Sequence, residues 1–199
     1  MLPYTSILKS RPFLYLELKK AASLILQGFS IQEVKEKSIE ENLFALNTES
    51  RKREIASTIK NRIEILDEFL LNKIAYGSLQ TSKQIALYSI LKTDRLFFEF
   101  MKEVYSEKIL LKDFHITEKD FNMFFSRKAE QSEQIASWAD YTFYKLKQVY
   151  KRVLSEAGFI KNSRKEVEII PQIIEEDVKT HLQSIGDTPY LEVMLGGYR

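Results

Sequence analysis

Seven basic side chains lie close together in one stretch of the sequence, and they are the residues best suited to chemistry. Residues 141–165 contain seven bases and one acid, a charge of +6, whereas the whole chain carries only +2 and the other 174 residues therefore sum to −4. Clustered lysine and arginine side chains contact phosphate oxygens as point charges and hydrogen-bond donors. The stretch is therefore suited to a polyanion. Its bases are Lys145, Lys147, Lys151, Arg152, Lys161, Arg164 and Lys165.

A long amphipathic helix is expected over residues 138–157, ending at Gly158, and it presents four of these bases together. With 100° per residue, apolar residues from Phe143 to Ala157 fall on one broad face, which is expected to pack on the core. No carboxylate interrupts the opposite arc, whereas a merely soluble helix usually mixes charge signs. Phenol and amide groups on this arc can donate hydrogen bonds to phosphate. The arc consists of Tyr141, Tyr144, Lys145, Lys147, Gln148, Lys151 and Arg152.

Two short strands are expected directly after this helix. The run 166–169 alternates acidic and apolar residues, which is the period of a strand, and residues 159–160 supply the strand before it. The polar tip between the strands carries Lys161, Arg164 and Lys165. A helix followed at once by a hairpin with a basic tip favours a winged arrangement, in which the hairpin loop contacts the same phosphate backbone as the helix.

The basic arc also has a simpler interpretation, because lysine-rich helix faces are often only solvated or paired with acids from elsewhere in the fold. The acids considered as such partners are Glu130, Glu133, Glu175 and Glu176. A second basic set lies at the start of another expected helix, whose core stripe is Ile55, Ile59, Ile63 and Leu66. This set is weaker because Glu54 and Glu64 are nearby, and it consists of Arg51, Arg53 and Lys60.

Catalysis and metal binding find little support in the sequence. The chain has no cysteine, and its two histidines, His115 and His181, are 66 residues apart. No phosphate loop, nucleophile elbow or dinucleotide-binding fingerprint is present. We therefore expect a protein without enzymatic activity, without a metal site or cofactor, and without a small-molecule substrate.

The elements that must position the basic residues are mainly helical. The chain has only six Gly and four Pro, and the helical period dominates from residue 14 onward, with capping-box starts at residues 30–33 and 117–120. The period is lost around residues 109–116, which predicts two small helical subdomains, 1–112 and 113–199. The predicted fold class is all-α with one short β-hairpin near the C-terminus. The longest stretch without a charge, residues 21–32, is too short to span a membrane, so a cytoplasmic protein without membrane contact is expected.

Three motifs in this order resemble the BrxA family of bacteriophage-exclusion (BREX) defence systems, over about residues 13–191. They are E-N-L-F at 41–44, K-x-x-R-L-x-x-x-F-x-x-E-V-Y at 92–105, and W-x-x-x-T-x-x-K-L-x-Q-V-x-x-x-x-L-x-x-A-G-F at 138–159. The resemblance implies two helical subdomains with likeness to the antitermination factor NusB and to winged helix-turn-helix modules. It also implies binding of double-stranded DNA without strong sequence preference, and other BREX proteins as partners. Lys145 and Gln148 match the family pattern.

Three functions remain open at this point. The leading hypothesis is an accessory DNA-binding protein whose second half docks on the duplex backbone. A protein-interaction adaptor, with its basic arc against an acidic partner in the same defence complex, has the same charge pattern. RNA binding, as the likeness to NusB implies, is the third.

Overall fold

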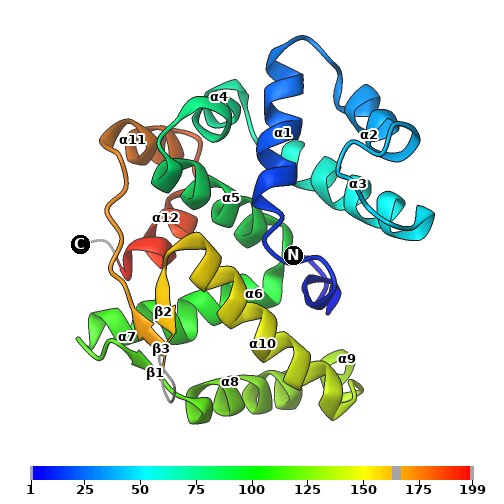
Figure 1. Ribbon diagram of the computed structural model, residues 1–199. Helices are drawn as coiled ribbons and strands as arrows, with labels where there is room; N and C mark the ends of the chain where they lie inside the picture. The colour runs from blue at the N-terminus through cyan, green and yellow to red at the C-terminus, as the bar shows by residue number, and fades with distance from the viewer. Residues whose placement is uncertain (1, 163–166, 198–199) are drawn as a thin grey trace. The chain divides into compact units, whose positions relative to one another are not determined.

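The computed structural model describes residues 2–162 and 167–197 (Figure 1). The contacts within the chain group it into two units. The helical unit is Phe13–Thr93, and the mixed unit combines Met1–Pro12 with Asp94–Arg199. These units do not coincide with the expected subdomains 1–112 and 113–199. The reason is that residues 94–110 form helices that pack on α8 (Glu118–Gln131) and α12 (Thr188–Leu195) of the mixed unit.

The helical unit is a set of helices joined by short turns. α1 packs on α4, α2 on α3, and α4 on α5. The predicted stripe Ile55, Ile59 and Ile63 is buried on α3, which confirms the helical period read from the sequence. The capping box at the start of α2 is also confirmed, with the Ser30 hydroxyl accepting from the Glu33 amide. The elements are α1 (Tyr15–Leu26), α2 (Ile31–Glu40), α3 (Glu49–Ile63), α4 (Glu68–Tyr76) and α5 (Leu79–Thr93).

The mixed unit combines helices with a small antiparallel sheet. Its strands lie in the order β1-β3-β2. Before the sheet come η1 (Ile7–Lys9), α6 (Arg95–Phe100), the π-helical segment η2 (Met101–Ser106) and α7 (Glu107–Leu110). The sheet region comprises β1 (His115–Ile116), α8 (Glu118–Gln131), α9 (Glu133–Ala136), α10 (Asp140–Ala157), β2 (Ile160–Asn162) and β3 (Val167–Ile169). The unit ends with α11 (Glu176–Ser184) and α12 (Thr188–Leu195).

The sheet confirms the mainly helical fold with a short hairpin and adds one strand. The expected hairpin is present as β2 and β3, and Ile160 pairs with Ile169 in its register. Ile116 of β1 pairs with Val167 on the other edge of β3. The sequence predicted only a connection over residues 109–116, because a two-residue strand is too short to show its own alternation. The hairpin tip, including the expected site residues Arg164 and Lys165, lies outside the described residues.

Aromatic packing fixes the face that α10 turns to the core of the mixed unit. The buried ring of Tyr150 lies 4.9 Å from Phe97 and 5.2 Å from Phe100, measured between ring centroids. Phe100 in turn stacks on Phe121 of α8 at 4.9 Å. Gly158 ends α10 with a φ of +82°, a left-handed conformation that glycine adopts without strain. The opposite face of α10 is therefore directed outward.

A buried ion cluster attaches α8 to α6 and η2. The ammonium group of Lys128 lies 2.6 Å from a carboxylate oxygen of Glu99 and also pairs with Glu103. The same Glu99 carboxylate accepts hydrogen bonds from Arg95, at 2.7 Å, and from the Tyr4 hydroxyl. Burial alone would raise the pKa of Glu99, but the hydrogen bonds from its partners outweigh burial and hold this pKa below its ordinary value. The position of α8 beside α6 is therefore tied to the charged state of these groups.

Candidate nucleic-acid interface

The exposed side of α10 carries the tyrosine and polar residues predicted for it. Tyr141 and Tyr144 are 67% and 52% exposed, and Gln148 and Arg152 continue the exposed line at helical spacing. Leu146, Val149, Tyr150, Val153 and Leu154 are buried on the other side. The predicted division of this helix into a core face and a surface face is confirmed.

Tyr141, Tyr144, Lys145 and Gln148 form a contacting group, which we call the tyrosine cluster. The two tyrosine rings are 6.4 Å apart, and the Lys145 ammonium lies 5.3 Å from the centroid of one and 5.9 Å from the other. Gln148 donates a hydrogen bond of 2.8 Å to the Tyr144 hydroxyl and accepts one from Lys145 at 3.4 Å. Among the described residues, no acid pairs with Lys145. The cluster thus offers one cation whose charge is available to an anion.

Lys147 and Lys151 are held by an acid from α8 instead of being free. The Lys147 ammonium lies 2.9 Å from one oxygen of Glu118 and 3.1 Å from Asn122, and Lys151 pairs with the other Glu118 oxygen. These hydrogen bonds, from Lys151 first and Lys147 second, lower the pKa of Glu118. The basic arc of α10 is therefore partly neutralised by Glu118. This acid was not among the partners considered from the sequence.

Glu118 is the site residue that sequence reasoning missed. Its position at the first turn of α8 was predictable, because Thr117 and Asp120 form the capping box that starts this helix. The pairing was not predictable, because it joins residues 29 and 33 positions apart and depends on how α8 packs against α10. The Glu118 carboxylate bridges the two lysine ammonium groups, one on each of its oxygens.

The remaining predicted bases differ in how available they are. Arg152 pairs with Glu156 one helical turn on, at 2.6 Å, and both side chains are exposed. Such exposed pairs contribute little and open readily. Lys161 is exposed on β2, where its register partner on β3 is Glu168. Together with the tyrosine cluster, Arg152 and Lys161 make up the accessible part of the predicted site.

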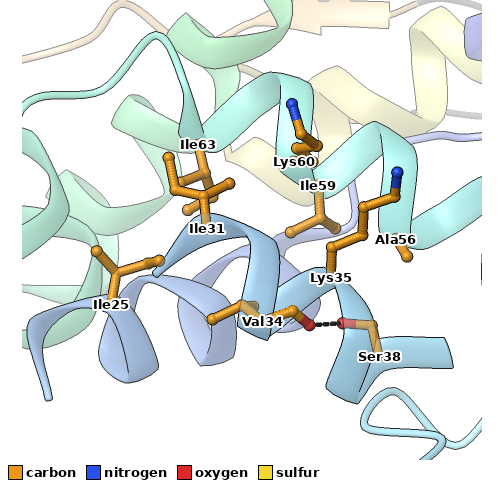
Figure 2. Close-up of a pocket in the computed structure, with 9 residues that line it drawn as sticks. All are labelled: Ile25, Ile31, Val34, Lys35, Ser38, Ala56, Ile59, Lys60 and Ile63. Atoms are coloured by element: carbon orange, nitrogen blue, oxygen red, sulfur yellow. Dashed lines mark hydrogen bonds between the residues drawn. The ribbon is translucent and has the colours of Figure 1, made fainter. Parts of the chain in front are cut away.

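The second basic set lies on α3 of the helical unit and is largely paired. Arg51 lies 3.4 Å from Glu54, Lys60 pairs with Glu64, and Arg53 is exposed. Figure 2 shows Lys60 beside a hollow between α2 and α3 that is lined mainly by apolar side chains such as Ile59 and Ile63. This hollow has a volume of about 10 Å³, room for about one water molecule. It is too small for a ligand.

Two further features are missing from the described part of the chain. There, no group of three or more His, Asp or Glu side chains comes together in a way that could hold a metal ion. Nor is any described helix both long enough and apolar enough to cross a membrane.

Fold and surface together define a mainly α-helical protein that presents an exposed tyrosine and lysine cluster on a long helix beside a small antiparallel sheet. The sequence model of the BrxA family matches residues 2–186, and the chain belongs to this family. It is 52% identical to the "BREX protein BrxA" of Bacillus cereus (strain H3081.97), over 97% of this chain and 96% of that protein. The resemblance seen in the three sequence motifs is confirmed.

A more distant relative carries the same name, and a solved structure has the same fold. The "BREX protein BrxA" of Escherichia coli O9:H4 (strain HS) is 22% identical over 93% of this chain and 86% of that protein. A crystal structure of an uncharacterized protein from Magnetospirillum magneticum has a TM-score of 0.81 to this chain. That likeness covers 98% of this chain and 99% of the other at 20% identity, so it supports the fold alone.

Proposed function

We propose that this chain binds double-stranded DNA, largely without sequence preference, as a non-enzymatic accessory protein of a BREX phage-defence system. The role in BREX is supported by family membership and by the names of its relatives in Bacillus cereus and Escherichia coli. Other BREX proteins are then its partners. DNA binding is supported by the surface of α10, as follows.

The order of elements in the mixed unit supports the expected winged helix-turn-helix arrangement, with the short helix α9 between α8 and α10. A first helical segment is followed by β1, then by α8 and the long helix α10, and then by the β2–β3 hairpin, with β3 between the other two strands. In such modules the second helix of the pair lies in the major groove. α10 would then be the groove helix, and the hairpin would lie beside it on the backbone.

The observation that carries the proposal is the tyrosine cluster on the exposed side of α10. Lys145 supplies a positive charge without an acid partner among the described residues, while the tyrosine hydroxyls and Gln148 supply hydrogen-bonding groups. Where these contacts go to phosphate and sugar they carry no sequence information, which agrees with binding that has little sequence preference. Arg152 and Lys161 extend the same surface, and Arg164 and Lys165 stay part of the hypothesis on the basis of the sequence.

A titration of a random duplex with the Lys145→Glu/Arg152→Glu double variant tests this site. We expect at least about tenfold weaker binding at low salt, and a log–log salt slope smaller by about 0.9 for each phosphate that the variant no longer neutralises. The matched control is Lys102→Glu/Lys112→Glu, which changes the net charge equally at exposed positions of η2 and the turn after α7. Equal affinities of the two folded double variants would contradict the site.

The same titration separates the other two functions. An adaptor that meets an acidic protein should show no shift below about 10 µM duplex, which lies within the range of nonspecific binding. Structured and single-stranded RNA, added as competitors, should displace the duplex at far lower concentration if RNA is the ligand. The pairing of Lys147 and Lys151 with Glu118 is the observation that favours the adaptor hypothesis, because it reduces the free positive charge on α10.

A further inference from the structure

A hollow of about 260 Å³ lies between η2, α7 and α8 of the mixed unit. One wall is a π-helical segment, a rare form that often occurs at functional sites. Another is the turn after α7, where Lys112 has a φ of +57°, which is uncommon for a residue other than glycine. The residues that line it are Glu103, Val104, Glu107, Lys108, Leu111, Asp113, Asp120, Met123 and Arg127.

Large apolar side chains are exposed at the rim of this hollow. Leu111 is 78% exposed and Met123 is about half exposed, whereas Val104 is buried beneath them. Covering a fully exposed leucine side chain contributes about 1.5–3 kcal/mol, so the fold leaves this free energy unused in the isolated chain. Apolar side chains that gather around a hollow are typical of a surface where a partner docks.

The charges around the hollow indicate the sign of that partner. Four acids and two bases line it, and Lys128 pairs with one of these acids, Glu103, from outside the lining, which leaves a net charge of −1. Lys108 is already engaged, with its ammonium 2.6 Å from Asp113 and 3.2 Å from Asp120. Glu107 is exposed, and no base pairs with it among the described residues. A positive charge on the partner is therefore complementary to the rim at Glu107.

The volume indicates the size of the inserted group. Sites for small molecules usually measure about 300–1,000 Å³, and this hollow is smaller. A single large apolar side chain of a protein segment matches it better than a cofactor does. We propose that the hollow docks a segment of a partner protein that inserts one large apolar side chain over Val104, between Leu111 and Met123, and pairs a lysine or arginine with Glu107.

This docking surface is compatible with DNA on α10, because the two use different sides of α8. Glu118 and Asn122 contact lysines of α10. Asp120, Met123 and Arg127 line the hollow. At 100° per residue, the second group lies about 140–200° around the helix from Glu118. A partner protein and a duplex can therefore be bound at the same time.

Tiled peptides from the other proteins encoded with this chain in one BREX system test the proposal, and this choice of peptides rests on the proposed function. Labelled wild-type protein should capture peptides in which a large apolar residue is flanked by lysine or arginine. The Leu111→Asp and Glu107→Lys variants should each bind those peptides at least about tenfold more weakly, since the first removes the apolar rim and the second reverses the paired charge. Leu16→Asp is the matched control, because Leu16 is a comparably exposed leucine, 73%, on α1 of the helical unit.

Three results would overturn the docking proposal: capture of no peptide, capture of acidic peptides only, or equal binding by wild type and the two variants. Sedimentation of the wild type provides a further check, because self-association that Leu111→Asp abolishes would make a second copy of this chain the occupant. Duplex affinity, measured on the same samples, should be unchanged in Leu111→Asp. Failure of peptide binding and failure of DNA binding are therefore distinguishable.

Discussion

Neutralising Glu118 is expected to strengthen DNA binding, because this carboxylate competes with phosphate for two lysines. Lys147 and Lys151 each bond one of its oxygens, so a phosphate that approaches them shares the lysines with an existing carboxylate and is repelled by it. The Glu118 side chain is 56% exposed, which leaves it accessible to exchange. The Glu118→Gln variant keeps the shape of the side chain and removes its charge.

The size of the effect follows from the distance at which a phosphate would sit. A phosphate on the same lysine pair would lie roughly 6 Å from the carboxylate, where like charges repel by about 0.7 kcal/mol in bulk water and about 3 kcal/mol at a dielectric constant of 20. An exposed group lies toward the water end of this range, which gives about threefold to tenfold tighter binding for Glu118→Gln. Two additional lysine–phosphate contacts would also make the log–log salt slope more negative by up to about 1.8.

Fluorescence anisotropy with a short random duplex over a range of salt concentrations measures both quantities. Glu130→Gln is the control, because it removes an exposed carboxylate from the same helix with the same change in net charge. Glu118 lies in the first turn of α8, so its neutralisation also costs about 0.3–1 kcal/mol of helix-dipole stabilisation, and a thermal melt should check that both variants are folded. Unchanged affinity and slope relative to the control would refute competition. Weaker binding would mean that Glu118 positions the lysines.

The stability of the mixed unit yields three further predictions. Tyr150→Phe should raise the free energy of unfolding in urea by about 1 kcal/mol, because the buried Tyr150 hydroxyl has no hydrogen-bond partner among the described residues. A decrease of similar size would show that this hydroxyl has a partner. Lys128→Met should lower the free energy of unfolding by about 3 kcal/mol, because Glu99 and Glu103 would keep their charges without the ammonium group that neutralises them. An unchanged urea midpoint would contradict this prediction. The lowered pKa of Glu99 means that its stabilisation is complete above its ordinary pKa of 4.5 and is lost as the pH falls through the lowered value. Urea titrations from pH 6 to pH 3 should therefore show falling stability, with a shallower fall in Glu99→Gln.

The local pattern of apolar residues was sufficient to predict α10 and its two faces. Features that depend on long-range packing, such as the boundary between the units, could not be predicted from it. The period of apolar residues and the helix end at Gly158 predict this helix from local sequence alone. Tyr141 and Tyr144 lie on its exposed side, as expected. The boundary of the units was not visible, because Asp94 caps α6 by accepting a hydrogen bond from the Phe97 amide, as at any ordinary helix start. The apolar period is lost near residue 109 because this region lies between a π-helical segment and a short strand. Both of these elements belong to the mixed unit, so the loss of period does not mark a boundary between the units.

The mixed unit as a whole carries no net charge that would attract DNA. Any affinity of this unit for DNA must therefore come from the local arrangement of single side chains. Its sequence contains 18 basic and 18 acidic residues, so long-range attraction over the whole unit largely cancels. Three of the four basic residues on the predicted arc of α10 have acid partners, and only Lys145 has none among the described residues. Binding by this surface therefore has to exchange internal ion pairs for phosphate contacts. Such an exchange lowers the net gain per contact, and it makes affinity depend on the acids beside the lysines as much as on the lysines themselves.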